Sequence, residues 1–187
     1  MRVFAAAAVA LAIALPGAAA AQPISEATGP DTYLHVHLGA FVPQADLADL
    51  NTGYTFGAAF GARFTRHLAV EAGVALQGAR ESAAGLRYTD VPISVSLVAR
   101  LPLKQAELAG YGGADLHLAR LSSTGGGSTG TEVGFGGHLG ARIGFNVWPT
   151  TLVGLDLRLS RASAHFDGVA ADLQDVRCAV TLQHRFN

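Results

Sequence analysis

The sequence predicts an all-β fold: an eight-stranded antiparallel up-and-down transmembrane β-barrel. Three observations lead to this prediction. Apolar and polar residues alternate in eight successive segments, the connections alternate between short and long, and the chain begins with a segment typical of exported proteins. Because successive side chains of a strand lie on opposite faces of the sheet, each segment has one apolar wall and one polar wall.

Residues 1–21 are predicted to be a signal peptide. Arg2 supplies the positive charge, residues 3–15 form a short apolar stretch, and alanines at 19–21 provide small residues for cleavage. The apolar stretch is shorter than the roughly 20 residues that a transmembrane helix needs. Residues 22–32 then form a short N-terminal extension, and residues 33–187 form one outer-membrane β-barrel domain.

The composition limits the classes of partner and fold. The formal net charge is -1, which offers no basic patch, so no nucleic-acid partner is expected. Hydrophobic residues make up 50% of the chain, yet no apolar run after residue 21 is long enough for a transmembrane helix. The apolar residues are therefore spread over alternating strands. The single cysteine, Cys178, has no partner for a disulfide and falls on an apolar face, where we expect it to contact lipid.

Each predicted strand is a segment of regular alternation that ends where Gly, Pro, Ser or Asp residues interrupt it. In chain order the predicted strands are Tyr33–Val42, Gly53–Phe64, Leu68–Gln77, Asp90–Leu101, Leu108–Ala119, Glu132–Asn146, Thr151–Arg161 and Asp175–Phe186. Residues 65–67, 102–107 and 147–150 form short connections, whereas 43–52, 78–89, 120–131 and 162–174 form long polar ones. This asymmetry is typical of outer-membrane barrels, whose short turns face the periplasm.

Each predicted strand has an apolar face, which supports its assignment as a membrane-spanning strand. The predicted outward positions, strand by strand, are Leu34, Val36, Leu38 and Ala40; Tyr54, Phe56, Ala58, Phe60 and Phe64; Leu68, Val70, Val74 and Leu76; Val91, Ile93, Val95 and Leu97; Leu116 and Leu118; Phe135, Leu139, Ile143 and Phe145; Val153, Leu155, Leu157 and Leu159; and Val180, Leu182 and Phe186. The pattern leaves the face of Leu152 open. None of these positions is charged, and an Arg or Lys at the bilayer midplane would cost about 2–4 kcal/mol. The outer wall is therefore predicted to contact lipid.

Several stretches resemble the small outer-membrane β-barrel family that includes the OmpX, OmpW and OmpA transmembrane-domain types. Residues 53–64, GYTFGAAFGARF, and 65–71, TRHLAVE, are similar to its glycine-aromatic strand, turn and outgoing strand. Residues 90–97, DVPISVSL, and 108–114, LAGYGGA, are similar to its fourth and fifth strands. The resemblance implies export through the periplasm to the cell outer membrane. Members usually end on an aromatic residue that the assembly machinery reads, whereas here Asn187 follows Phe186.

The polar face of the strands is predicted to line the lumen. An eight-stranded barrel is only wide enough for its side chains to fill, so these groups must largely satisfy one another. Three acids meet six arginines and four histidines, so we expect a packed ionic network with excess positive charge; a narrow anion-leaky pore is the alternative. The expected structural network comprises His35, His37, Arg63, Glu71, Arg100, Asp115, His117, His138, Arg142, Asp156, Arg158, Arg177 and Arg185.

The histidines raise the question of a metal site, since imidazole binds zinc or copper. His35 and His37 share one wall, and His117 and His138 lie on the adjacent fifth and sixth strands. The first strand is far around the barrel from the fifth, so no metal ligands are predicted.

A catalytic site would need a nucleophile near a base, and Ser160, Ser163 and His165 lie close together in the sequence near one rim. The surrounding residues match no family motif of outer-membrane barrel enzymes. No catalytic or cofactor-binding residue is therefore predicted, and no cofactor.

The predicted function is that of a non-enzymatic, monomeric integral outer-membrane protein with a structural or surface-interaction role. Its expected partners are outer-membrane lipid and lipopolysaccharide, together with the barrel-assembly machinery during insertion. The alternative is a small OmpW-like channel for minor solutes or apolar molecules, and a soluble periplasmic β-barrel is the third option.

Overall fold

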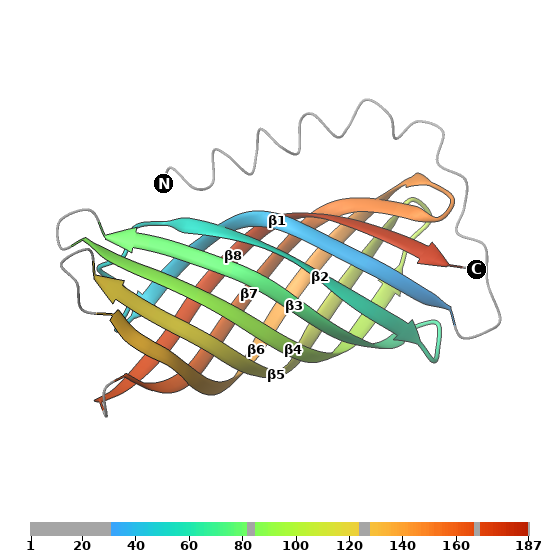
Figure 1. The fold of residues 1–187 in the computed structure, drawn as a ribbon. Coiled ribbons are helices and arrows are strands. Elements are labelled where there is room, and N and C mark those ends of the chain that lie inside the picture. The colour runs from blue at the N-terminus through green and yellow to red at the C-terminus, as the bar shows by residue number, and fades with distance from the viewer. Residues whose placement is uncertain (1–30, 82–84, 124–127, 167–168, 187) are drawn as a thin grey trace.

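The chain forms a closed antiparallel barrel of eight strands, in which each strand pairs with its neighbours in sequence and β1 pairs with β8 (Figure 1). The computed structural model describes residues 31–81, 85–123, 128–166 and 169–186. The predicted fold class is confirmed. The predicted signal peptide and residues 22–30 of the extension lie outside the described residues. The strands are β1 Thr32–Ala45, β2 Gly53–Arg63, β3 Leu68–Glu81, β4 Leu86–Pro102, β5 Ala106–Ser123, β6 Ser128–Trp148, β7 Thr151–Phe166 and β8 Val169–Phe186.

The two ends of the barrel differ. At the turn end, residues 64–67, 103–105 and 149–150 connect the strands. β1 begins and β8 ends at this same end of the barrel. These short connections agree with the prediction. At the opposite, loop end, residues 46–52 lead from β1 to β2. Within the described residues, no helix is long and apolar enough to cross a membrane.

Three of the four predicted long connections at the loop end, residues 78–89, 120–131 and 162–174, are wrong, because most of their residues belong to strands. β3 continues to Glu81 and β4 begins at Leu86, while β7 continues to Phe166 and β8 begins at Val169. A tilted strand needs only about 9–11 residues to cross a bilayer, whereas β6 has 21. Backbone pairing therefore continues past the point where the outward residues stop being apolar, and the apolar pattern alone could not show where it ends.

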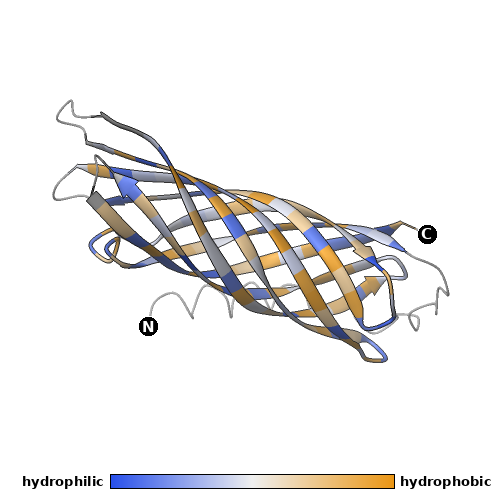
Figure 2. Ribbon diagram, turned by 90° about the horizontal axis from the view of Figure 1, so that it is seen from below, coloured by the Kyte–Doolittle hydropathy of each residue, from blue (hydrophilic) through white to orange (hydrophobic). Residues whose placement is uncertain are grey.

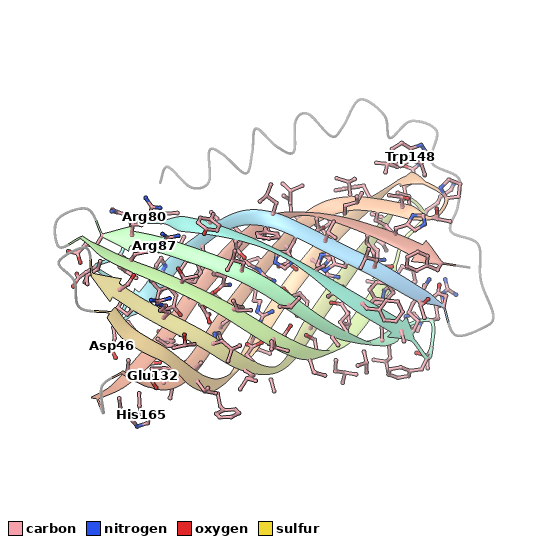
Figure 3. The ribbon with its side chains drawn as sticks, in the orientation of Figure 1. Asp46, Arg80, Arg87, Glu132, Trp148 and His165 are labelled. Carbon is pink, nitrogen blue, oxygen red and sulfur yellow. The ribbon has the colours of Figure 1, made fainter. Side chains whose placement is uncertain are left out.

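Exposed apolar side chains line the outer wall. Leu38, Phe135 and Leu139 are 66%, 72% and 69% exposed, and hydrophobic and hydrophilic residues alternate along the strands (Figure 2). Leu152, whose face the pattern left open, is buried in the lumen. Trp148 lies at the turn end, and Arg80 and Arg87 lie at the loop end (Figure 3). The lipid-facing surface is the band between them.

Two tyrosines lie against glycines of neighbouring strands inside the barrel. A Cβ atom on Gly61 would lie 2.2 Å from the Tyr33 ring, and a Cβ on Gly140 would lie 2.3 Å from the Tyr111 ring. Any larger residue would displace the ring, since real contacts are never that short. Glycine at these two positions therefore allows the rings to lie flat against the wall and direct their hydroxyl groups into the lumen.

Candidate functional site

The lumen is the candidate functional site, and it is filled in layers. The layer nearest the turn end combines rings and ion pairs. The guanidinium of Arg100 donates to Glu107 from Nε at 2.9 Å and from Nη2 at 2.6 Å, and Arg185 donates to the same carboxylate from across the barrel at 3.0 Å. Arg100 also lies over the Tyr33 ring, 4.9 Å from its centroid. Arg63 pairs with Asp31 at the same end.

The middle layer is centred on Arg142. Its guanidinium donates to Glu71 from Nη1 at 2.9 Å and from Nη2 at 3.2 Å, although β4 and β5 separate the two strands. Its Nε donates to Asp156 at 3.3 Å, and Arg177 donates to the same carboxylate at 3.1 Å. The Tyr33 hydroxyl donates to Glu71 at 2.7 Å. This layer therefore ties opposite walls of the barrel together.

The next layer toward the loop end is built on Asp115. This carboxylate pairs with Arg158 and lies 3.0 Å from His138 Nδ1. The other ring nitrogen of His138 lies 2.8 Å from the Ser96 hydroxyl. His117 Nδ1 lies 2.7 Å from Asp90 Oδ2. Both histidines are thus held by a carboxylate on a neighbouring strand.

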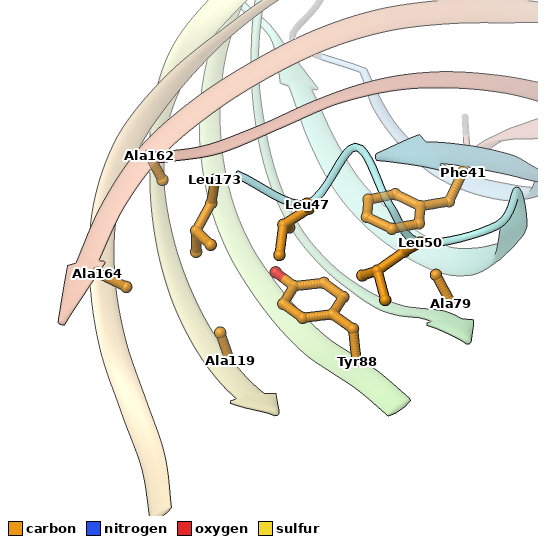
Figure 4. Close-up of a cluster of buried hydrophobic side chains, with 9 residues drawn as sticks. All are labelled: Phe41, Leu47, Leu50, Ala79, Tyr88, Ala119, Ala162, Ala164 and Leu173. Atoms are coloured by element: carbon orange, nitrogen blue, oxygen red, sulfur yellow. The ribbon is translucent and has the colours of Figure 1, made fainter. Parts of the chain in front are cut away.

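An apolar cluster closes the loop end of the lumen (Figure 4). The connection from β1 to β2 folds into the mouth, where Leu47 and Leu50 are 7% and 8% exposed. The rings of Phe41 and Tyr88 stack beneath them with centroids 6.0 Å apart. Residues 43–52 were predicted to be a long polar loop. Residues 46–52 do form a connection, but it is not polar throughout, because Leu47 and Leu50 cover the mouth. The cluster comprises Phe41, Leu47, Leu50, Ala79, Tyr88, Ala119, Ala162, Ala164 and Leu173.

The predicted excess of positive charge in the lumen is also wrong. Four further acids are buried there, Asp31, Asp90, Glu107 and Asp175. With Glu71, Asp115 and Asp156, seven carboxylates face six arginines among the described residues. The strand alternation could have identified them, since Asp90 has the parity of inward Ser96 and Arg100. The prediction omitted them because Asp90 and Asp175 are the first residues of predicted strands, Glu107 lies in a predicted connection, and Asp31 lies in the predicted extension.

The structure places all thirteen residues of the predicted network on the inner wall. Twelve are buried, and Arg63 is partly exposed near the turn end. They do not form one continuous network: Arg63, Arg100 and Arg185 pair with acids that the prediction omitted. His35 takes part in no hydrogen bond with a described residue, and its ring lies 5.7 Å from that of His37.

A cavity of about 20 Å³ lies in the middle of the lumen, lined by His35, His37, Ser96, Tyr111, Arg142 and Arg177 among others. A volume of this size has room for about one water molecule. In the part of the chain that the structure describes, no group of three or more His, Cys, Asp or Glu side chains is arranged to hold a metal ion.

The serines and histidine considered for catalysis do not come together. Ser160 is buried in the lumen and accepts a hydrogen bond from Arg158 Nε at 3.0 Å. Ser163 and His165 are both exposed on the outer face of β7. Their odd numbers place them opposite Ser160, so proximity in the sequence was misleading.

Comparisons with known proteins give a consistent result. Residues 5–182 match the family model described as outer membrane protein beta-barrel domain. Neisserial surface protein A has a similar structure, with a TM-score of 0.60, 14% identity, and coverage of 83% of this chain and 97% of that one. OprG from Pseudomonas aeruginosa also has a TM-score of 0.60, with 11% identity over 89% of this chain and 98% of its own.

A third similar structure is Ail, the attachment invasion locus protein of Yersinia pestis. It has a TM-score of 0.53 and 16% identity, and the match covers 85% of this chain and all of that one. At these identities the three structures show a shared fold only. Comparison with curated proteins gives no match.

Proposed function

Since this chain belongs to the outer membrane protein β-barrel domain family and lies in the cell outer membrane, we propose that it is a closed, non-conducting, non-enzymatic barrel with a structural or surface-interaction role. The filled lumen is the observation that supports this most strongly. Ion pairs that span the bore, from Arg142 to Glu71 and from Arg185 to Glu107, leave a central cavity of about 20 Å³. A hydrated ion needs a wider, continuous path.

The charge of the lumen supports the same proposal. An anion-leaky pore would need unpaired cations along the bore, and the arginines there face at least as many carboxylates. Arg142 and Arg177 share Asp156, and Arg100 and Arg185 share Glu107. An entering anion would have to displace these partners.

The barrel is oriented with its turn end toward the periplasm, as is usual for outer-membrane barrels. The loop end then projects beyond the apolar band on the cell surface, with exposed Arg80 and Arg87 on β3 and β4 and exposed Asp46 in the connection after β1. Such a projecting rim is available for contact with other surface molecules. Lipid and lipopolysaccharide surround the barrel, and the assembly machinery inserts it as a monomer.

Planar-bilayer conductance tests this proposal. The refolded protein is expected to give a silent membrane under applied voltage, in bilayers where a water-filled porin, added as a control, gives unitary steps. Reproducible steps from the wild-type barrel would refute the closed lumen and favour the small-channel alternative. A Glu71→Ala/Arg142→Ala variant, which removes the central pair, should be the first to conduct.

One observation favours the alternative of a carrier for apolar molecules. A groove of about 520 Å³ on the outer wall and the lumenal cavity both border His37, Ala58, Val74 and Ala75. Two of these four shared residues, Ala58 and Ala75, have small side chains. Uptake of a fluorescent apolar solute into liposomes that contain the protein, above the rate of empty liposomes, would support this role.

A further inference from the structure

Three arginines stand together on the outer face at the loop end. Arg80, Arg87 and Arg120 belong to the adjacent strands β3, β4 and β5, and all three are exposed. Arg80 lies directly opposite Arg87 in the pairing of β3 with β4, and the two are labelled side by side in Figure 3. Arg120 lies opposite Thr89, two residues along β4 from Arg87. Directly opposite and diagonal neighbours on one face have Cβ atoms within about 8 Å, so three guanidinium groups can reach one ligand.

No described carboxylate pairs with any of these arginines. Among the described residues, none of the three guanidinium groups has a hydrogen bond or an ion pair. Arg161, on the outer face of β7, differs because its Nη2 lies 2.7 Å from Asp172 Oδ2. Like charges directly opposite each other destabilise a sheet. An anion bound between Arg80 and Arg87 would turn this repulsion into attraction.

A groove of about 290 Å³ lies beside the arginines. It is lined by residues that include Asn51, Tyr54, Gly78, Arg80, Arg87 and Tyr88. The Tyr54 ring lies against Gly78, where an added Cβ atom would be 2.9 Å away. Two arginines and a tyrosine therefore border one groove, a combination that suits a phosphate group attached to a sugar.

The position of the three arginines along the barrel axis indicates which part of the membrane surrounds them. Toward the turn end, the next outward apolar side chains are Leu76 on β3 and Val91 on β4, each after one intervening outward residue (Gly78 and Thr89), and Leu118 on β5 directly. These side chains belong to the apolar band, so the arginines lie at the level where lipid headgroups begin. In the orientation proposed above, on which this inference rests, that level is the outer leaflet.

We propose that Arg80, Arg87 and Arg120 bind a phosphate group of a phosphorylated glycolipid in the outer leaflet, with the sugar in the groove beside Tyr54. The guanidinium fork binds phosphate oxygens with two parallel hydrogen bonds. The acyl chains of the same lipid then lie along Leu76, Val91 and Leu118.

Native mass spectrometry of the full chain in neutral detergent micelles tests this site. The probes are diphosphoryl lipid A, the same lipid without its phosphates, and inorganic phosphate. Wild-type protein is expected to retain one diphosphoryl lipid A. The Arg80→Gln/Arg87→Gln/Arg120→Gln variant should bind it with a Kd at least about tenfold higher. The dephosphorylated lipid should bind both proteins equally weakly.

Two further variants serve as controls. Arg161→Gln removes a charge of the same rim that Asp172 already neutralises, and its Kd should equal that of the wild type. Arg87→Gln alone should weaken binding by about threefold, and it replaces the triple variant if heat-modifiable gel migration shows that the latter is not folded.

Three results would overturn the proposal: an unchanged Kd in the folded arginine variants, equally tight binding of the dephosphorylated lipid, or displacement of lipid A by equimolar inorganic phosphate, which would mark a site for the free anion. None of these results bears on the closed lumen, because the conductance test does not depend on the outer face.

Discussion

Replacing Glu71 by alanine is the sharpest test of how the lumen is held together. Glu71 is 5% exposed and accepts hydrogen bonds from Arg142 Nη1 at 2.9 Å, Arg142 Nη2 at 3.2 Å and the Tyr33 hydroxyl at 2.7 Å. The variant leaves Arg142 with Asp156 alone, at 3.3 Å. Breaking a buried ion pair by removing one partner costs about 3–5 kcal/mol. The stranded Tyr33 hydroxyl adds about 1–3 kcal/mol.

The free energy of unfolding can be measured by urea titration in lipid vesicles. Trp148 is the only tryptophan and lies at the turn end, so its fluorescence reports on barrel unfolding. Glu71→Met combined with Arg142→Met should cost less than Glu71→Ala, because no charge is then left buried without a partner. Asp156 keeps Arg177 and the Tyr111 hydroxyl in that variant.

The control is Arg161→Gln, which removes an ion pair whose arginine side chain is 73% exposed. Exposed pairs of this kind contribute little to stability, so its unfolding curve should overlay that of the wild type. The reasoning fails if Glu71→Ala is no more destabilising than this surface change, or if the double replacement is as costly as the single one.

Three further predictions follow from the fold. Leu157→Arg should destabilise the inserted barrel by about 2–4 kcal/mol, because Leu157 is an outward residue that is 51% exposed; an unchanged urea midpoint would contradict a lipid-facing wall. Gly140→Val should displace the Tyr111 ring and destabilise by about 1–3 kcal/mol, while Gly110→Val, where an added Cβ meets nothing within 4 Å, should be milder in the same titration. Leu50→Ala should loosen the lid over the mouth and cost about 2–5 kcal/mol; limited proteolysis should then cut residues 46–52 faster, and equal cutting rates would argue against a packed lid.

The strand alternation predicted which residues face lipid because it is a local property. Leu155, Leu157 and Leu159 face outward and Asp156 and Arg158 face inward whatever the rest of the barrel does. The same rule places Asp90 and Asp175 in the lumen, because both are the first residues of predicted strands and both have the inward parity. The limits of the strands could not be predicted, because above the membrane the outward residues need not be apolar.

Partners across the lumen could not be predicted from the sequence either. Arg142 and Glu71 are 71 residues apart and meet only because strand tilt and stagger bring β3 and β6 to the same height. Arg185 reaches Glu107 over 78 residues for the same reason. The lid was missed for a different reason: Leu47 and Leu50 lie in a connection, where no periodicity indicates that a leucine turns inward.

The seam between β1 and β8 sets the order in which this molecule can be completed. Fourteen residue pairs join them, from Thr32 with Phe186 to Ala45 with Leu173. Without β8, both edge strands of the open sheet have unpaired amide and carbonyl groups, which are costly in hydrocarbon. A seven-stranded precursor is therefore not stable in the bilayer. Deleting a few residues from the carboxyl terminus would remove hydrogen-bond partners from β1 as well as from β8.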